Sequence, residues 1–298
     1  MKQFFEVNGK QYVLATDFKH NSNLRSGFNE LTMKTYRFDF EHWYQNGYWK
    51  EQYIPYSLLD GDKVIANISV NLIDFYVLGE KKRYVQIGTV MTDNDYRRQG
   101  LSRLLMEIII SEWERKCDLI YLFANDSVIN FYPKFGFAPT AEYQYSKQVT
   151  KKVGKNNFRK IDVDNIIDRN LLFDTVSNTI PYSKIAMINN PYLVMFNCTS
   201  FLKNSIYYLS DYEVIAVAQL DKGRLYLQDI FSSQSISIDK VINSLISMDT
   251  IKVILGFVPE EVDSYDVNLL KEEDTTLFVK AIKDELPKNI MFPILSRA

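Results

Sequence analysis

Residues 87–106 read IGTVMTDNDYRRQGLSRLLM, and this stretch indicates the fold of the chain around it. An apolar, strand-like run is followed by a polar turn, a basic loop around Gly100 and an amphipathic helical pattern. The first turn of a helix has backbone N–H groups without partners and carries the positive end of the helix dipole. Arg97, Arg98 and Arg103 add fixed positive charge there. We therefore predict that the loop binds an anionic group such as a pyrophosphate.

The loop matches neither of two common nucleotide-binding patterns, because the sequence contains no GxxxxGK[ST] and no GxGxxG. Residues 97–102, RRQGLS, instead resemble the acetyl-CoA loop R/Q-x-x-G-x-G/A of the GNAT superfamily of N-acetyltransferases. Ser102 stands where that family usually has Gly or Ala, and serine is small enough to let a ligand approach the backbone. Alone, such a loop is also typical of a solvated helix start.

A second motif follows the next apolar run, Leu119–Ala124. Residues 125–137 read NDSVINFYPKFGF and are similar to the other GNAT signature, N-x-x-A-x-x-F-Y-x-K-x-G-F. Val128 replaces the usual Ala. The matching positions are Asn125, Phe131, Tyr132, Lys134, Gly136 and Phe137. Two motifs in the family's order and spacing identify the chain as resembling a GNAT N-acetyltransferase.

The resemblance implies acetyl-CoA as the cosubstrate and assigns its binding residues. The backbone of Val90, Met91 and Thr92 would bind the pantetheine and the acetyl carbonyl, while the side chains of Val90 and Met91 are expected in the core. Asn125 would hydrogen-bond the cofactor, and its alternative role is a helix N-cap. The pyrophosphate would lie against the loop and the helix start, at Arg97, Arg98, Gln99, Gly100, Leu101, Ser102 and Arg103.

Tyr132 matches the family tyrosine that gives a proton to the thiolate of coenzyme A, and its alternative role is a packed aromatic side chain. An alkyl amine has a pKa near ~10, so a base or a desolvating pocket must help to remove its proton. Many GNAT enzymes carry a glutamate on the strand before the loop, but residues 84–90 contain no acid. A water relay or a carboxylate from elsewhere would have to serve.

The tail Phe292–Ala298 is apolar enough to pack against the protein. Some tandem GNAT acetyltransferases that this chain resembles place their terminal carboxylate in the catalytic cleft, which would supply the missing base. The alternative is a tail docked on the second half of the chain for stability.

The segment from Tyr36 to Tyr53 is rich in aromatic residues interleaved with Asp39, Glu41 and Glu51. In this fold that region shapes the acceptor site, and aromatic faces with carboxylates suit a cationic amine. We expect Trp43, Tyr44 and Trp49 to bind substrate. The alternative is a helix with a core-facing aromatic side and a solvated acidic side.

Composition narrows the class of protein. The chain has 298 residues, 46% of them apolar, and a net charge of −2, so no global basic field recruits nucleic acid. Cys117 and Cys198 lack metal-type spacing and are expected as buried thiols in a reducing compartment, the cytoplasm. With only His20 and His42, no metal site is expected. The sequence contains no run of 18 apolar residues, so no membrane span is expected.

Strand and helix patterns alternate in both halves, which predicts a mixed α/β (α+β) fold. We predict a GNAT acyl-CoA N-acyltransferase fold at 1–146, a polar, basic linker at 147–160 and a second, degenerate GNAT-like domain at 161–298. The second half repeats the order of elements, but residues 232–235, SSQS, replace the basic glycine loop.

Two hypotheses about function follow. The first is an acetyl-CoA-dependent N-acetyltransferase that acts by direct attack of a primary amine, from a small molecule or a peptide, on the thioester. The second is a non-catalytic acyl-CoA-binding or scaffold protein that keeps the loop but lacks the base.

Overall fold

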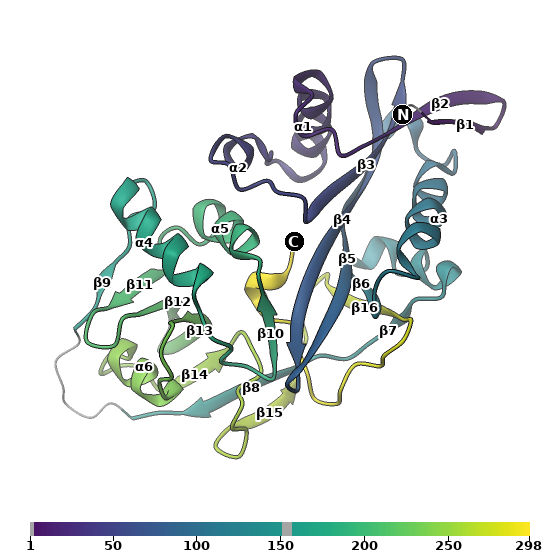
Figure 1. Ribbon diagram of the computed structural model, residues 1–298. Coiled ribbons are helices and arrows are strands. Elements are labelled where there is room, and N and C mark those ends of the chain that lie inside the picture. Colours follow the sequence, from purple (N-terminus) through teal and green to yellow (C-terminus); the bar gives the residue numbers. More distant parts are fainter. Residues whose placement is uncertain (1–2, 151–156) are drawn as a thin grey trace.

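The structure is a computed structural model that describes residues 3–150 and 157–298. It contains two twisted sheets, one of nine strands and one of seven, with helices packed on them and the C-terminus lying between the two halves (Figure 1). No helix in the described part of the chain is long and apolar enough to cross a membrane.

The first sheet has the order β1-β2-β3-β4-β5-β6-β16-β7, and β10 pairs with β4 outside this path. A tight turn at Gly61 joins β3 to β4, and an Asp-Gly pair such as Asp60-Gly61 is typical of this kind of hairpin. The strands are β1 Gln3–Val7, β2 Lys10–Thr16, β3 Tyr53–Asp60, β4 Lys63–Val77, β5 Glu80–Thr92, β6 Leu119–Ala124, β7 Ala138–Pro139, β10 Ile185–Ile188 and β16 Thr276–Ala281.

Two helices cover opposite faces of the first sheet. Helix α1, Ser22–Tyr36, starts where the Asn21 side chain accepts a hydrogen bond from the Leu24 N–H. Helix α3, Leu101–Trp113, buries its apolar stripe, including Leu105 and Ile109, against the other face. The short helix α2, Glu41–Gln45, follows α1.

The second sheet has the order β15-β8-β14-β13-β12-β11-β9. Its strands are β8 Tyr143–Gln148, β9 Arg159–Lys160, β11 Ile206–Leu209, β12 Val214–Asp221, β13 Arg224–Phe231, β14 Lys252–Leu255 and β15 Asp266–Leu269. Its helices are α4 Ile166–Ser177, α5 Pro191–Ser200 and α6 Ile238–Leu245.

The two sheets exchange one strand each. Strand β8 leaves the first half and lies between β14 and β15, whereas β16 returns from the second half and lies between β6 and β7. A division at residue 146 therefore differs from the division between the sheets. Of the predicted linker, residues 147–148 belong to β8 and 159–160 to β9, while 151–156 lie outside the described residues.

Candidate active site

The parallel strands β5 and β6 separate part-way along their length. They pair from Tyr84–Ile87 to Leu119–Leu122, and beyond this point neither strand continues the ladder. On its other side β5 pairs with β4, where the register shifts between Asn67 and Ser69. A bulge of this kind bends a strand and increases its twist. The two strands therefore diverge at their carboxyl ends.

Thr89 lies in the bent part of β5 with a φ of +49°, which is uncommon for a β-branched residue. Buried hydrogen bonds hold it there. Its hydroxyl pairs with the Tyr53 hydroxyl at 2.8 Å, and its carbonyl accepts from the Asn67 side-chain amide at 3.0 Å. Ser57 in turn donates to Asn67 at 2.8 Å. Strain maintained by such a network is typical of functional sites.

A cavity of about 1140 Å³ occupies the space between the diverging strands. Nearly all of the predicted cofactor residues line it: Val90, Met91, Thr92, Arg97, Arg98, Gly100, Leu101, Ser102, Arg103 and Asn125. Gln99 does not, because its side chain bonds the Tyr12 hydroxyl and the Asp95 carbonyl instead. The Leu101 side chain is buried in the core, so only its backbone is available to a ligand.

The start of α3 is open to an anion. Gly100 takes a φ of +89°, which favours glycine, and no side chain caps the helix. No atom lies within 4 Å of the position that a Cβ of Gly100 would occupy. Arg97 and Arg98 are exposed, and neither forms an ion pair with a carboxylate in the described part of the chain. The Thr92 and Ser102 hydroxyls lie 2.8 Å apart and join the strand end to the helix start.

Tyr132 lines the cavity from the 3-10 turn η3, Tyr132–Phe135. Pro133 lies inside this turn, where a proline is tolerated because the first turn needs no N–H donor from it. Tyr132 is buried, and burial raises the pKa of its hydroxyl above the usual range. Its hydroxyl makes no hydrogen bond to the protein within the residues described, so it is a protonated donor without a partner.

Asn125 follows β6 and precedes the turn η2, Asp126–Val128. Its side chain caps no backbone N–H, so the alternative role as a helix cap is not realised. Its Oδ1 accepts a hydrogen bond from the Ser127 hydroxyl at 2.6 Å. The residue lines the cavity.

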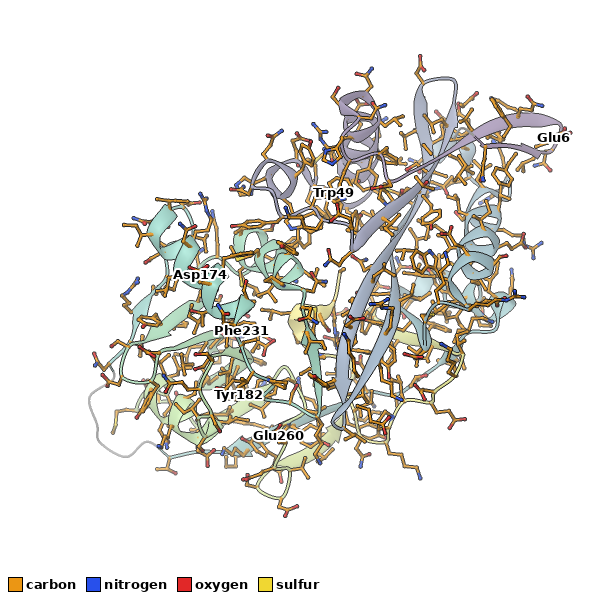
Figure 2. All side chains as sticks on the ribbon, viewed as in Figure 1. Glu6, Trp49, Asp174, Tyr182, Phe231 and Glu260 are labelled. Carbon is orange, nitrogen blue, oxygen red and sulfur yellow. The ribbon has the colours of Figure 1, made fainter. Side chains whose placement is uncertain are left out.

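The predicted acceptor residues Trp43, Tyr44 and Trp49 lie outside the cavity, which corrects their assignment. Trp43 and Trp49 are buried in the core, and Trp49 lies between α2 and β3 in Figure 2. The Trp43 indole donates to the carbonyl of Tyr192 at 3.0 Å, across to the second half. The misassignment arises because aromatic residues recur too closely here to reveal which ones face inward.

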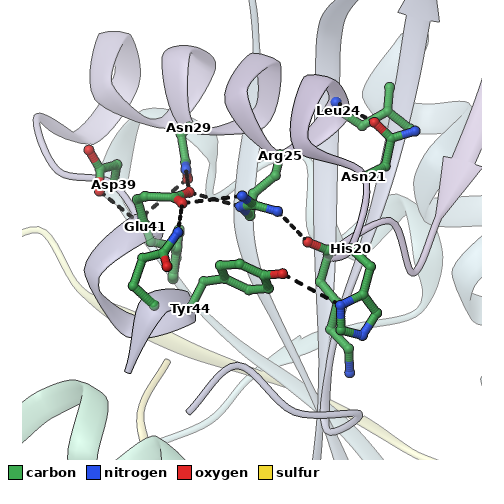
Figure 3. Close-up of polar contacts among 11 residues, drawn as sticks. His20, Asn21, Leu24, Arg25, Asn29, Asp39, Glu41 and Tyr44 are labelled. Carbon is green, nitrogen blue, oxygen red and sulfur yellow. Dashed lines mark hydrogen bonds and ion pairs between the residues drawn. The ribbon is translucent and has the colours of Figure 1, made fainter. Parts of the chain in front are cut away.

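The acids of the same segment are also engaged elsewhere (Figure 3). The Arg25 guanidinium bonds Glu41 at 2.9 Å and holds the pKa of that carboxyl below its usual range. The Tyr44 ring lies 3.8 Å from the same guanidinium. Glu51 pairs with Lys19 at 2.6 Å. The alternative interpretation, a core-facing aromatic helix with an acidic outer side, therefore describes this segment.

Ala298 lies in the cavity beside β5. Its N–H donates to Gln86 Oε1 at 3.1 Å, and the Gln86 side-chain amide donates to the Ala298 oxygen at 3.4 Å. A Cβ on Gly88 would lie 3.1 Å from that oxygen, so glycine provides the space. The expectation that the tail reaches the cleft is confirmed for the position of Ala298.

Residues before Ala298 anchor the tail to both halves. The Phe292 ring stacks on Tyr121 with 4.0 Å between centroids, and Leu295 is buried in the core of the second sheet. Arg297 pairs with Glu142 at 3.1 Å and Glu272 at 2.5 Å. The tail is therefore docked for stability as well as directed into the cavity.

Eight aromatic residues besides Tyr132 line the cavity, and five of them lie in the aromatic segment or at α5. Tyr36 also donates from its hydroxyl to the carbonyl of Val90 at 2.8 Å. The set is Tyr36, Phe38 and Phe40, which belong to the aromatic segment, and Phe196 and Phe201, which α5 and the residue after it bring from the second half. No sequence motif marks the last two.

Both cysteines are free and buried, as expected. The described residues contain no group of three or more His, Cys, Asp or Glu side chains placed to hold a metal ion.

Comparison with known proteins assigns the domain that carries the loop. Residues 22–137 match the sequence profile of the Acetyltransferase (GNAT) family. These residues form a GNAT acetyltransferase domain. The cosubstrate of GNAT acetyltransferases is acetyl-CoA. The matched range contains both the loop and Tyr132 of this GNAT domain. None of the curated proteins matches the chain.

Solved structures of low sequence identity share the fold of the GNAT domain and of most of the chain. A probable N-acyltransferase from Enterococcus faecalis V583 aligns with a TM-score of 0.60 at 13% identity, over 91% of this chain and 72% of its own. A GCN5-related N-acetyltransferase from Kribbella flavida aligns with a TM-score of 0.54 at 11% identity, over 91% and 72%. Eis1 from Mycobacterium abscessus aligns with a TM-score of 0.51 at 13% identity, over 91% and 74%.

Proposed function

We propose that this protein is an acetyl-CoA-dependent N-acetyltransferase that moves an acetyl group to a primary amine. One observation carries the proposal: a single cavity joins the uncapped, basic start of α3 to the side chain of Tyr132 across the diverging strands. An anion site and a proton donor in one cavity are what a thioester carried on a pyrophosphate requires.

The loop and strand β5 hold the cosubstrate in this proposal. The N–H groups at the start of α3, with Arg97 and Arg98, bind the pyrophosphate, and Gly100 leaves room for it. The backbone of β5 from Val90 to Thr92 binds the pantetheine, since β6 does not pair with this part of the strand. The Val90 carbonyl is taken by Tyr36, so Tyr36 shifts when that carbonyl binds pantetheine.

The amine nitrogen attacks the thioester carbonyl carbon, the C–N bond forms and the C–S bond breaks. Tyr132 gives its proton to the sulfur that leaves, and the desolvation that raises its pKa keeps that proton on the hydroxyl until the thiolate forms. The tyrosinate then regains a proton from solvent.

We propose that a water relay takes the proton of the ammonium group, because residues 84–90 on β5 contain no acid.

The second half supports the proposal without a second cofactor site. We infer that it is a GNAT-like module that has lost its loop, because β11 to β14 and α6 repeat the element order of the first sheet. We also keep the cytoplasm as the proposed compartment, in line with two free, buried thiols.

An amine panel tests the function. The protein is mixed with acetyl-CoA and simple primary amines, and release of free thiol is measured. Turnover with at least one amine supports the enzyme. Binding of acetyl-CoA without thiol release for any primary amine or peptide N-terminus would favour the non-catalytic acyl-CoA-binding alternative.

A further inference from the structure

Five aromatic side chains form one continuous side of the cavity, which we call the aromatic wall. Phe196 stacks on Phe40 with 5.3 Å between centroids, and the Phe38 ring meets the Phe40 ring edge-on at 5.2 Å. Phe201 meets Phe38 and Phe196, each at 5.6 Å. Tyr36 completes the wall beside Phe38 at 6.1 Å. The two halves of the chain build this surface together.

The wall keeps an apolar ring in contact with water. Phe201 is 56% exposed although it touches two other rings of the wall. Burying a phenyl ring is favourable, so a ligand that covers Phe201 gains binding free energy from that contact. Edge-to-face and offset contacts add to that gain when a further ring arrives.

The cavity offers little to a ligand with several positive charges. Among the described residues that line it, the one acidic side chain is Asp274, and its carboxylate already accepts the Asp126 N–H at 2.7 Å. Glu41 and Glu51 pair with Arg25 and Lys19 outside the cavity.

We propose that the acceptor is a primary amine that carries an aromatic or similarly flat apolar group, an arylalkylamine in its simplest form. The inference rests on the proposed function and names its substrate class. The ring stacks on the wall at Phe196 and Phe201, while the amine points to the part of the same cavity that Gly88 lines. Elements that differ from those of the anion site supply the wall, so both ligands fit the cavity together.

Steady-state kinetics at saturating acetyl-CoA tests the substrate class. The value of kcat/KM is measured for 2-phenylethylamine, ethylamine and spermidine, compared at equal concentrations of the free amine. We expect 2-phenylethylamine to exceed both of the others by at least about tenfold, which corresponds to about 1.4 kcal/mol of binding in the transition state. Equal values, or a preference for spermidine, would overturn the inference and leave the N-acetyltransferase standing. No thiol release with any amine would remove the proposed function and the inference together.

A matched pair of variants locates the preference. Phe201→Ala removes an exposed ring of the wall, and Phe4→Ala removes a ring that is 64% exposed on β1, away from the cavity. We expect the ratio of kcat/KM for 2-phenylethylamine over ethylamine to fall about fivefold to tenfold in Phe201→Ala and to stay at the parent value in Phe4→Ala. An unchanged ratio in Phe201→Ala, with an unchanged melting temperature, would show that the wall does not select the amine.

Discussion

In the described part of the chain, the parallel pairs β5-β6 and β13-β14 each lie between two antiparallel neighbours, but the two pairs end differently. In the second sheet β13 pairs with β14 from Arg224–Leu227 to Lys252–Leu255, and the Gly256 N–H continues the contact to the Leu227 carbonyl at 2.8 Å. The tail closes the edge, since the Ile294 N–H donates to the Gly256 carbonyl at 2.9 Å. In the first sheet β5 and β6 diverge around a cavity. A shared topology therefore yields a site only where no segment of the chain fills the gap.

The helices that follow β5 and β13 differ in how their N-terminal ends are capped. Helix α3 starts at Gly100 without a side-chain cap or an acid in its first turn. Helix α6 is capped by the Ser237 side chain and carries Asp239 in its first turn. The Ser237 cap and the Asp239 carboxylate already stabilise the N–H groups and the positive dipole end of α6. The same groups at the start of α3 have no such partners among the described residues and are available to a ligand. The difference predicts one cofactor site per chain.

The largest expected effect comes from separating the halves. A fragment of residues 1–146 loses β16, whose six residues Thr276–Ala281 pair with the whole of β6 and bury Leu277 and Phe278. We expect no cooperative thermal unfolding from this fragment, measured by circular dichroism. Co-expression of 1–150 with 157–298, which restores β16, should recover it. A cooperative transition in the fragment alone would show that the strand exchange is dispensable.

The next variant tests whether acetyl-CoA binds at the start of α3 and not at the start of α6. Gly100→Glu forces a side chain into a positive φ and adds negative charge where an anion would bind. We expect calorimetry to find one equivalent of acetyl-CoA per parent chain and none with the variant. Gly79→Glu, which places an acid at another positive φ with open space around it and away from the cavity, is the control and should retain binding. Two equivalents per parent chain would contradict the comparison.

Tyr132→Phe comes third. The change removes one hydroxyl that makes no hydrogen bond to the described part of the protein, so the fold and acetyl-CoA affinity should stay nearly constant. Turnover should fall by ~10²–10⁴-fold through the loss of the general acid. Tyr145→Phe, which removes a hydroxyl bonded to the Asn289 carbonyl outside the cavity, is the control. Parent-like turnover in Tyr132→Phe would reduce this residue to a packing role.

Local features of the site could be predicted from the sequence, because they depend on neighbouring residues. The Gly100 loop, the α3 stripe and the position of Tyr132 are of this kind. The partner of β6 could not, since apolar strands of similar composition in both halves satisfy the same edge. The bend at Thr89 depends on a buried network whose members lie on three strands, and no pattern in one of them reveals it.

The aromatic segment shows the same limit for the substrate side. Trp43, Trp49, Phe38 and Phe40 lie within one short stretch, and only the last two face the cavity. Phe196 of the second half stacks on Phe40, and this contact helps to determine which of the four rings line the cavity. The spacing of residues within the segment therefore cannot show which of its side chains a distant helix contacts.

The variant with the least effect lies in the second sheet, where β13 and β14 stay paired. Asp229 on β13 accepts the Ile230 N–H, and burial raises the pKa of its carboxyl to about 7. An acid whose folded pKa lies above its unfolded value stabilises the fold fully below pH about 4, and this contribution is lost as the pH rises through about 7. Asp229→Asn keeps an acceptor but no charge. We therefore expect its melting temperature to exceed that of the parent by a few degrees at pH 8 and to match it at pH 4.5, measured by differential scanning calorimetry. An equal difference at both pH values would mean that Asp229 is solvated, and that the second half is less tightly closed than the contacts of Gly256 and Ile294 indicate.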